Sequence, residues 1–263
     1  MKKRIDVLLT EKGLAKSREK AKTLVIAGDV YVNGAMVKSP SDLFDEEIEI
    51  NVKKDDCPYV SRGGLKLKKA IDKFYLSLDG LVCMDIGAST GGFTDCMLKH
   101  GAKFVYAIDV GYGQFDWELR NCEQVELHER TNARYLEPFE KQIDFVSVDV
   151  SFISLALIFP AISRVCQGHH AQIVTLIKPQ FEAGREHVGK KGVVRDEKVH
   201  EDVICKVIES AQKNELYLEN LTYSPVKGPN GNIEYLAYFM NTQANSVSND
   251  VKRVVQLAHE NLD

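Results

Sequence analysis

The stretch Asp85-Ile86-Gly87-Ala88-Ser89-Thr90-Gly91-Gly92-Phe93-Thr94-Asp95 decides the fold of this chain. It follows a short apolar run, Leu81-Val82-Cys83-Met84, that is typical of a strand, and it precedes residues 96–100, which are typical of a helix. Glycines let a ligand approach the backbone closely, and a helix N-terminus offers free N–H groups. The pattern therefore predicts a strand, a nucleotide-binding turn and a helix.

Three kinds of site share parts of this pattern. A dinucleotide-binding dehydrogenase requires G-x-G-x-x-G, but Ser89 occupies the position of the second glycine. A serine hydrolase requires G-x-S-x-G, which residues 87–91 match, and Asp149 followed by His169 or His187 has the right chain order. That serine normally follows several strands, whereas here it follows the first strand of its domain. The acidic first strand and glycine turn favour binding of S-adenosylmethionine (SAM), while a dehydrogenase, a hydrolase and a merely structural turn stay open.

A second acidic residue supports a cofactor site. Asp109 ends the next apolar run, residues 104–108, and lies 22 residues after Gly87. An acidic residue at this point of such folds accepts hydrogen bonds from ribose hydroxyls. From the first strand and its loop, the residues expected to bind the cofactor are Asp85, Gly87, Ser89, Thr90, Gly91, Gly92 and Phe93.

Basic residues are concentrated in two places, although the 263 residues have a formal net charge of −4. Residues 1–23 hold eight Lys or Arg against three acidic residues, and residues 53–73 hold seven against three. Both clusters flank the predicted cofactor site. We therefore expect a nucleic-acid partner rather than merely solvated helix faces.

Cysteine usage and hydropathy bear on location. The six cysteines are scattered singly, with no C-x-x-C and no histidine pair at zinc spacing. The N-terminus is charged, and no apolar run approaches the roughly 20 residues needed to span a bilayer. The sequence predicts a reduced, cytoplasmic protein that has no signal peptide, no membrane insertion and no bound metal.

The first 54 residues are expected to form a small α+β domain. Helical spacing covers residues 4–9 and 18–27, and strands are predicted at 30–34 and 48–52. This part resembles the αL RNA-binding motif of a small-subunit ribosomal protein and of pseudouridine synthases. The matching residues are Arg4-Ile5-Asp6-Val7-Leu8-Leu9, Gly13-Leu14-Ala15, Ser17-Arg18-Glu19-Lys20-Ala21, Ile26-Ala27-Gly28-Asp29-Val30 and Val32-Asn33-Gly34. The RNA-binding candidates are Arg4, Lys12, Lys16, Arg18, Lys20 and Lys22, with Arg62 beyond the domain.

After a linker at residues 55–61, residues 62–263 alternate strands and helices. Strands are predicted at 82–86, 104–109, 124–127, 144–149, 172–178, 216–225 and 233–240. Helices are predicted near 62–74, 92–100, 114–120, 153–165 and 197–213, with a docking helix after Ser248. This alternation predicts a Rossmann-like α/β fold, with a mostly parallel sheet, helices on both faces and an antiparallel hairpin at one edge.

Four charged residues stand at the ends of otherwise apolar segments. They are Lys66, Asp149, Lys178 and Glu234. The carboxyl ends of strands in open α/β sheets face the ligand crevice. Asp149 and Lys178 are therefore expected in the same cleft as the glycine loop.

With these residues, the chain resembles the TlyA-type proteins, hemolysin-like ribosomal RNA 2′-O-methyltransferases whose catalytic domain is related to FtsJ. The matching segments are Tyr59–Leu67, Asp85–Asp95, Ala107–Gln114, Glu129–Asn132, Val148–Leu155 and Ile177–Glu182. The resemblance implies a SAM-dependent methyltransferase domain. The family's Lys-Asp-Lys-Glu tetrad falls on Lys66, Asp149, Lys178 and Glu234, and all four residue types agree.

The resemblance also implies a mechanism and a substrate. SAM lies along the glycine loop, with Asp109 at its ribose and with Asn132 and Asp149 towards its adenine and methionine ends. Lys178 accepts the proton of an RNA 2′-hydroxyl, while Asp149 and Glu234 orient the two lysines. The expected substrate is a cytidine ribose of large-subunit ribosomal RNA, free or in a ribosomal subunit, and small-subunit RNA stays open as a second substrate. Longer members of the family modify both RNAs; this chain is short at both ends, which favours the large subunit.

Further basic residues are expected at the RNA site, and two competing functions stay open. Arg62, Arg185, Lys190, Lys191 and Arg195 are expected to hold RNA phosphates, and residues 182–196 to form a mobile substrate loop. A membrane-active hemolysin and a non-catalytic RNA-binding protein are the competing functions. Neither requires the intact tetrad.

Overall fold

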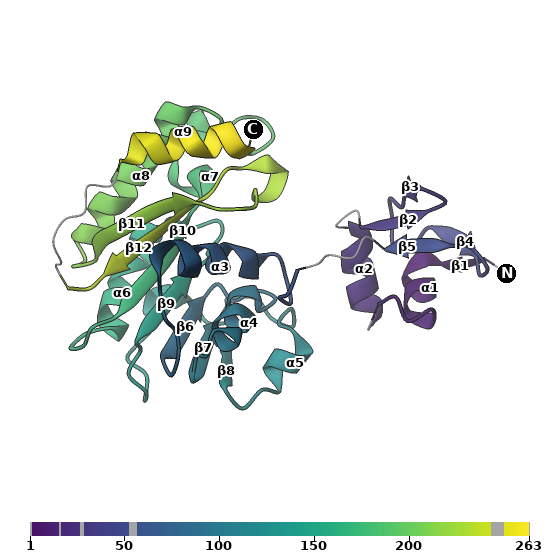
Figure 1. Cartoon of the computed structure of the whole chain (residues 1–263), viewed down its shortest axis with the longest axis horizontal. Helices are drawn as coiled ribbons and strands as arrows, with labels where there is room; N and C mark the ends of the chain where they lie inside the picture. The colour runs from purple at the N-terminus through teal and green to yellow at the C-terminus, as the bar shows by residue number, and fades with distance from the viewer. Residues whose placement is uncertain (1, 16, 27–28, 53–56, 243–249, 263) are drawn as a thin grey trace. The chain divides into compact units, whose positions relative to one another are not determined.

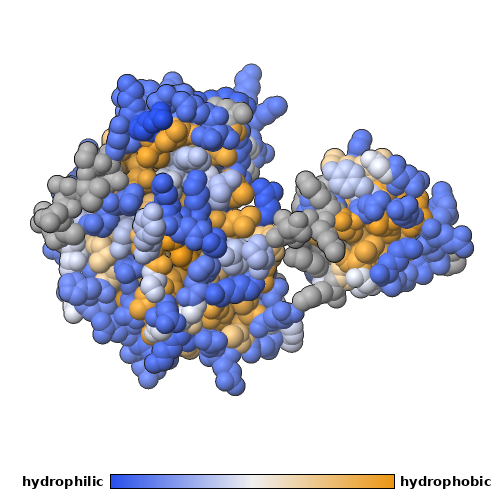
Figure 2. Space-filling model, viewed as in Figure 1, coloured by the Kyte–Doolittle hydropathy of each residue, from blue (hydrophilic) through white to orange (hydrophobic). Residues whose placement is uncertain are grey.

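The computed structural model describes residues 2–15, 17–26, 29–52, 57–242 and 250–262. The chain divides into two compact units, Met1–Asp56 and Cys57–Asp263, and each is described by itself. Figure 1 shows the helices and strands of both units. Figure 2 shows a largely hydrophilic surface on the visible face of each unit, with hydrophobic residues between the polar ones.

The small unit packs two helices against short strands. Its elements are β1 (Lys2–Arg4), α1 (Ile5–Glu11), α2 (Arg18–Ile26), β2 (Val30–Val32), β3 (Ala35–Met36), β4 (Leu43–Asp45) and β5 (Ile50–Val52). Apolar residues of the helices and of β2 and β5 form its core, among them Ile5, Leu9 and Val30. The sequence did not predict β1, because three consecutive cations give no apolar alternation. This strand is defined by antiparallel backbone pairing with β4.

The large unit is built on a seven-stranded sheet with the order β11-β12-β10-β9-β6-β7-β8. The strands are β6 (Val82–Ile86), β7 (Phe104–Ile108), β8 (Val125–His128), β9 (Phe145–Val148), β10 (Gln172–Ile177), β11 (Tyr217–Tyr223) and β12 (Tyr235–Met240). Strands β6 to β10 pair in parallel, while β12 pairs antiparallel with both β10 and β11. The predicted mostly parallel sheet with an antiparallel hairpin, whose β11 forms one edge, is confirmed.

Helices cover both faces of this sheet (Figure 1). They are α3 (Gly63–Phe74), α4 (Gly92–Lys99), α5 (Trp117–Arg120), α6 (Phe159–Val165), α7 (Pro179–Glu182), α8 (Glu197–Gln212) and α9 (Val251–Leu262), with short 3₁₀ turns at Ala133–Tyr135, Leu155–Leu157, Arg185–His187 and Pro229–Gly231. Apolar residues of α3 and α4 form one core with Cys83, Val105 and Leu236. Residues of α6, α8 and α9 form the other core, on the opposite side of the strands. The predicted Rossmann-like arrangement is therefore confirmed.

Two predicted helices differ from the structure. The helix expected at 114–120 is only α5, because the Asp116 carboxylate accepts a hydrogen bond from the backbone N–H of Glu118 and caps the helix there. The helix expected at 153–165 is divided into a 3₁₀ turn and α6, with Pro160 in the first turn of α6. Proline has no N–H and fits a first turn better than a helix interior.

The strand order reverses at β6, which pairs with β7 on one side and β9 on the other. Ligands of open α/β sheets bind outside the carboxyl ends of the strands at such a point. The glycine loop follows β6 directly. The fold therefore places this loop where a ligand is expected.

Close packing at the start of α3 makes a testable difference between two neighbouring glycines. A Cβ atom on Gly64 would lie 2.3 Å from Cγ of the buried Tyr59 ring, whereas on Gly63 the nearest atom would be Ser61 Oγ at 3.4 Å. We expect Gly64→Ala to lower the free energy of unfolding by about 1–3 kcal/mol through overpacking. Gly63→Ala is the matched control and should leave stability unchanged or slightly higher. Urea unfolding measures both, and equal stabilities would contradict the packing argument.

Candidate active site

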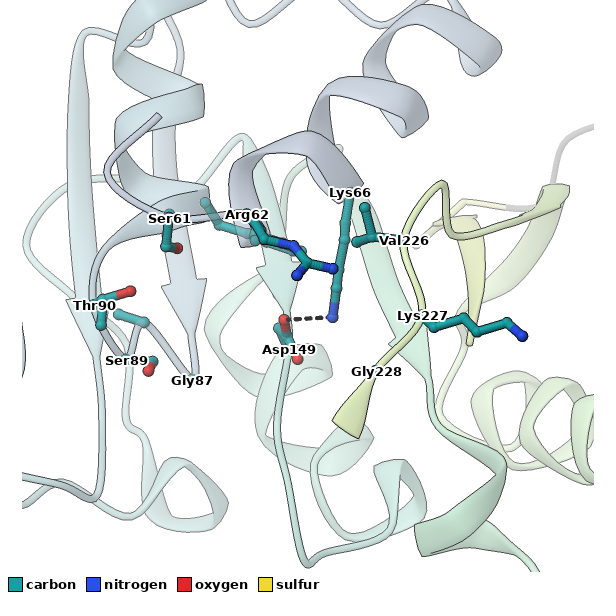
Figure 3. Close-up of a pocket in the computed structure, with 14 residues that line it drawn as sticks. Ser61, Arg62, Lys66, Gly87, Ser89, Thr90, Asp149, Val226, Lys227 and Gly228 are labelled. Carbon is teal, nitrogen blue, oxygen red and sulfur yellow. Dashed lines mark ion pairs between the residues drawn. The ribbon is translucent and has the colours of Figure 1, made fainter. Parts of the chain in front are cut away.

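A cavity of about 400 Å³ opens at the carboxyl ends of the central strands, beside the glycine loop. Its lining residues are Ser61, Arg62, Gly63, Lys66, Gly87, Ala88, Ser89, Thr90, Gly92, Phe93, Asp149, Val226, Lys227 and Gly228. They come from the start of α3, from the loop after β6, from the end of β9 and from the segment before β12. In Figure 3, Arg62 and Lys66 point towards Asp149, whereas Lys227 points away. The volume is that of a small-molecule site.

The loop after β6 requires glycine at two of its positions. Gly87 has φ +87°, and a Cβ atom there would lie 2.4 Å from the backbone oxygen of Asp149. Gly91 has φ +94° and directly precedes α4, where a Cβ atom would lie 2.5 Å from Leu119. Left-handed backbone favours glycine, and contacts this short exclude a side chain. The loop can therefore lie close to the end of β9 and still present its backbone to the cavity.

Asp109 holds the far side of this loop. Its Oδ2 accepts a hydrogen bond from the backbone N–H of Ser89 at 2.7 Å, and its Oδ1 accepts one from Gly111 at 2.6 Å. Ser89 has φ +50°, a left-handed conformation for a residue with a side chain. The carboxylate thus orders the loop, and it retains lone pairs for a further donor.

Asp85 lies beneath the loop rather than in the cavity. It is fully buried, and its carboxyl group accepts hydrogen bonds from Thr94 Oγ1 at 2.7 Å and Ser147 Oγ at 3.0 Å. Burial raises the pKa of Asp85 to about 7, against the opposing effect of these two hydroxyl donors. The residue connects β6 with α4 and β9, and its contacts are those of a support for the loop.

The four residues of the predicted tetrad lie together at one edge of the sheet. Lys66 Nζ is 2.8 Å from Glu234 Oε2 and 3.7 Å from Asp149 Oδ2. Lys178 Nζ is 2.5 Å from Asp149 Oδ1. Glu234 is fully buried, and Lys178 is 7% exposed. Asp149 therefore bridges the two lysines, and the cluster contains two positive and two negative groups.

Neighbouring groups fix both ends of this cluster. Lys178 Nζ donates a hydrogen bond to Ser151 Oγ at 2.9 Å, and Gln180 Nε2 donates to Glu234 Oε1 at 3.3 Å. Burial lowers the pKa of Lys66, but the charges of Asp149 and Glu234 outweigh burial and raise the pKa above its ordinary value. Lys66 is therefore held as a cation.

The segment that carries Glu234 also anchors the predicted substrate loop. Asn232 is buried; its Oδ1 accepts a hydrogen bond from the backbone N–H of Val194 at 3.2 Å, and its Nδ2 donates to the carbonyl of Gly192 at 2.9 Å. Residues 184–187 and 189–191 are exposed, whereas Val193 and Val194 are buried. The structure thus fixes the end of the loop, and the mobility expected for the rest stays a prediction.

Several predicted site residues lie outside the cavity lining. Asp85 and Asp109 support the loop as described, and Gly91 directly precedes α4. Asn132 is exposed, and its side chain accepts a hydrogen bond from the backbone N–H of Arg134. Lys178 and Glu234 join the site through Asp149 and Lys66. The sequence did not single out Ser151, Gln180 or Asn232, because polar residues inside or beside strand ends carry no distinctive spacing.

The hydrolase interpretation has no support in this geometry. His169 Nε2 is 2.6 Å from the carbonyl oxygen of Ile143, before the start of β10 and thus at the amino edge of the sheet. His187 is exposed and lies 3.8 Å from Glu186. Asp149 is engaged by two lysines. Neither histidine contacts Ser89 or Asp149 among the described interactions, so no catalytic triad is assembled.

In the small unit, one buried carboxylate holds two of the RNA-binding candidates. Asp6 is fully buried, and it pairs with Arg4 at 3.0 Å and Arg18 at 3.2 Å, both partly exposed. The Arg4 guanidinium, opposed by burial and assisted by Arg18, lowers the pKa of Asp6. Lys12 is exposed and Lys22 pairs with Glu19. Lys16 and the side chain of Lys20 lie outside the described residues.

Comparison with protein families defines the class. Residues 59–240 match the family described as FtsJ-like methyltransferase, and residues 3–50 match the S4 domain. The chain belongs to the FtsJ-like methyltransferases and carries an S4 domain before the catalytic part.

Individual relatives narrow the family further. YqxC of Bacillus subtilis (strain 168) is 46% identical over 99% of this chain and 95% of its own length. A Mycobacterium tuberculosis (strain CDC 1551 / Oshkosh) relative is 42% identical over 89% of this chain and 88% of its own, and is named 16S/23S rRNA (cytidine-2′-O)-methyltransferase TlyA. A solved structure from Streptococcus thermophilus is 45% identical with a TM-score of 0.79, covering 99% of this chain and 96% of that one. The chain thus belongs to the TlyA-type family.

Metal ligands and membrane-spanning helices are both absent from the part of the chain that the structure describes. These residues contain no cluster of three His, Cys, Asp or Glu side chains arranged to hold a metal ion. Among the helices of the same ranges, none is long and apolar enough to cross a bilayer.

The pKa of Asp85 gives a stability prediction. Between about pH 4, where the unfolded carboxyl titrates, and pH 7, the folded protein holds a proton that the unfolded chain lacks. The free energy of unfolding should therefore fall as pH rises through this range and level off above it. Between pH 5 and 7, the free energy of unfolding of wild type should fall by up to about 2 kcal/mol more than that of Asp85→Asn. Urea unfolding at several pH values measures this difference, with the exposed Asp79→Asn as control; a flat difference for Asp85→Asn would refute it.

Proposed function

We propose that this protein is a SAM-dependent 2′-O-methyltransferase that modifies a cytidine ribose of ribosomal RNA, with large-subunit RNA as the main substrate. The observation that carries the proposal is the Lys66–Asp149–Lys178–Glu234 cluster beside a cavity at the carboxyl edge of the sheet. The S4 domain and the activity named for the Mycobacterium tuberculosis relative support an RNA substrate. Such a substrate implies action in the cytoplasm.

The residues around the cavity fit the cofactor. The loop from Gly87 to Phe93 would hold SAM with its backbone, and Asp109 would meet the ribose hydroxyls. Asp149 would offer a carboxylate to the ammonium group of the methionine part. When bound, SAM supplies a methyl group on a sulfonium sulfur.

Lys178 is suited to remove the proton of the RNA 2′-hydroxyl. A ribose hydroxyl is a poor nucleophile, so a base must accept its proton as the new bond forms. A neutral amine has two N–H groups and one lone pair. Asp149 and Ser151 accept two hydrogen bonds from Lys178. To act as the base, Lys178 must be neutral when SAM and RNA are bound, in contrast to the cation that pairs with Asp149 in the tetrad as described above. Its lone pair is then left for the substrate hydroxyl.

The other three tetrad residues keep Lys178 in place. Lys66 remains charged between Asp149 and Glu234 and fixes both carboxylates. Glu234 in turn is held by Gln180. Removing one member of such a buried group leaves the others with an uncompensated charge.

The RNA would contact both units. Arg4 and Arg18, held by Asp6, would offer guanidinium groups to phosphates, and the small unit also carries the candidates Lys12 and Lys22. In the large unit, Arg62 lines the cavity and is exposed. Arg185, Lys190, Lys191 and Arg195 are also exposed and would offer further cations to phosphates.

The proposal predicts separate effects on chemistry and on binding. We measure transfer of radiolabelled methyl from SAM to large and small ribosomal subunits from a strain that lacks the modification. Wild type should label large-subunit RNA, whereas Lys178→Ala and Lys178→Arg should lower the rate by about 10²–10⁴-fold, because neither can accept the proton. SAM binding, measured by calorimetry, should change little. Lys68→Ala is the matched control on the exposed side of α3 and should keep full activity.

Each failure has its own meaning. SAM binding without transfer to any RNA would leave a non-catalytic RNA-binding protein. Full activity of Lys178→Arg would exclude Lys178 as the base. A wild-type chain that binds no SAM would overturn the methyltransferase proposal, and leakage from lipid vesicles would then support a membrane-active protein.

A further inference from the structure

Helix α3 carries a basic stripe that extends beyond the tetrad. Arg62, Lys66, Lys69 and Lys73 follow one another at intervals of four, three and four residues, which places them on one side of a helix. Lys66 turns into the tetrad and Arg62 lines the cavity (Figure 3). We call Arg62, Lys69 and Lys73 the α3 stripe. Its last two members lead away from the cavity towards the end of the helix.

Packing keeps the stripe on the side of α3 next to β11. Leu67, Ala70 and Phe74 are buried against the sheet, and α3 contacts both β11 and β12 (Figure 1). The acidic residue within the helix, Asp72, lies three residues after Lys69 and therefore borders the stripe, but its carboxylate pairs with Lys68 at 2.5 Å. The α3 stripe is therefore a line of cations next to the edge strand β11, and the acidic residue of α3 beside it is paired with Lys68.

Lys69 is held in an environment that favours an anionic ligand. Its Nζ lies 3.4 Å from the ring centroid of Tyr223, and the side chain is half-buried. Burial and then the charge of Lys73 lower the pKa of Lys69 to about 8, and no carboxylate opposes them among the described residues. The positive charges of Lys69 and Lys73 repel each other at this partly desolvated site. A phosphate group bound between them would compensate both charges.

An aromatic residue stands at the end of the stripe. Tyr75 caps α3 with φ +55° and is 94% exposed. A left-handed backbone is unfavourable for a residue with a side chain, and Tyr75 shares no ring stacking with another described residue. Sites for single-stranded nucleic acid combine two components: cations along the phosphate backbone and exposed aromatic rings on which bases stack.

We propose that the α3 stripe binds successive phosphates of a single-stranded RNA segment adjoining the methylated nucleotide, and that Tyr75 stacks on one of its bases. This inference rests on the proposed function, which supplies the RNA. From Arg62 to Lys73 the helix rises about 16 Å, which corresponds to about five stacked nucleotides. The stripe begins at the cavity, so a strand whose ribose reaches the tetrad continues along α3.

The test compares neutralised and charge-keeping variants of the full chain. Fluorescence anisotropy with a labelled 20-nucleotide single-stranded RNA measures affinity at several salt concentrations. Lys69→Gln with Lys73→Gln should weaken binding about tenfold or more near 0.1 M salt and reduce the salt slope by about 1.4, since two phosphate contacts are lost. Lys69→Arg with Lys73→Arg should bind like wild type, and Lys68→Gln is the neutralised control on the same helix. Tyr75→Ala should weaken binding about tenfold at an unchanged salt slope.

Methyl transfer separates this inference from the proposed function. With ribosomal RNA as substrate, the neutralised double variant should raise KM and leave kcat unchanged. If wild type methylates RNA and the variant has an unaltered KM and salt slope, the stripe is not an RNA site. If no RNA is methylated but the variant loses RNA affinity, the stripe is upheld and the proposed function is not.

A second measurement uses the unaltered protein. Acetylation of lysines by an N-hydroxysuccinimide ester, read by mass spectrometry, should be suppressed by the same RNA at Lys69 and Lys73 and not at Lys68. Equal labelling with and without RNA would overturn the inference. Protection by an acidic polypeptide such as polyglutamate, but not by RNA, would assign the stripe to a protein partner and overturn it as well.

Discussion

The carboxylate of Asp149, placed between two lysines, is the contact on which the rest of the large unit's site depends. Lys66 comes from α3, Lys178 follows β10, and Glu234 precedes β12, so a single buried cluster fixes the ends of four separate segments. Charges are costly to bury, and they persist here because each has an opposite partner. In addition, Lys178 donates a hydrogen bond to Ser151, and Glu234 accepts one from Gln180. The two lysines and two carboxylates balance one another in charge, which permits their burial. The same pairing holds Lys66 at the edge of the cavity.

The arrangement of the sheet explains why this cluster and the glycine loop meet. Reversal of the strand order at β6 leaves room beside the loop, and the short contact between Gly87 and the Asp149 backbone brings the end of β9 up to it. On the other side, Gly228 lies so close to Glu234 that a Cβ atom would be 2.1 Å from Oε1. Gly87 and Gly228 thus approach the charged cluster from two directions. Because neither has a side chain, the cavity and the tetrad can lie together at the carboxyl edge of the sheet.

Much of this could be predicted from the sequence, for physical reasons that differ between its parts. Strands β6, β7 and β10 are mostly apolar, so their positions followed from hydropathy, and the four tetrad residues stood out as charges in otherwise apolar surroundings. Other features depend on contacts between distant segments. Asp85 looks like a cofactor ligand in the sequence, yet its position on the α4 side of β6 directs it to Thr94 and Ser147. Gln180 and Asn232 carry no local pattern, because their partners lie 38 to 54 residues away. Asp6 joins Arg4, two residues away, to Arg18, 12 residues away, and only the fold brings Arg18 to it.

The position of β12 in the sheet has a consequence for when the site comes into being. This strand lies between β10 and β11, and Glu234 just before it meets Lys66 across 168 residues of sequence. During synthesis the N-terminal parts of a chain emerge and fold first. The S4 domain and the glycine loop can therefore form while translation continues, but the tetrad is incomplete until β12 has left the exit tunnel. A protein proposed to act on ribosomal RNA thus acquires its reactive centre only after its S4 domain and glycine loop can already have folded.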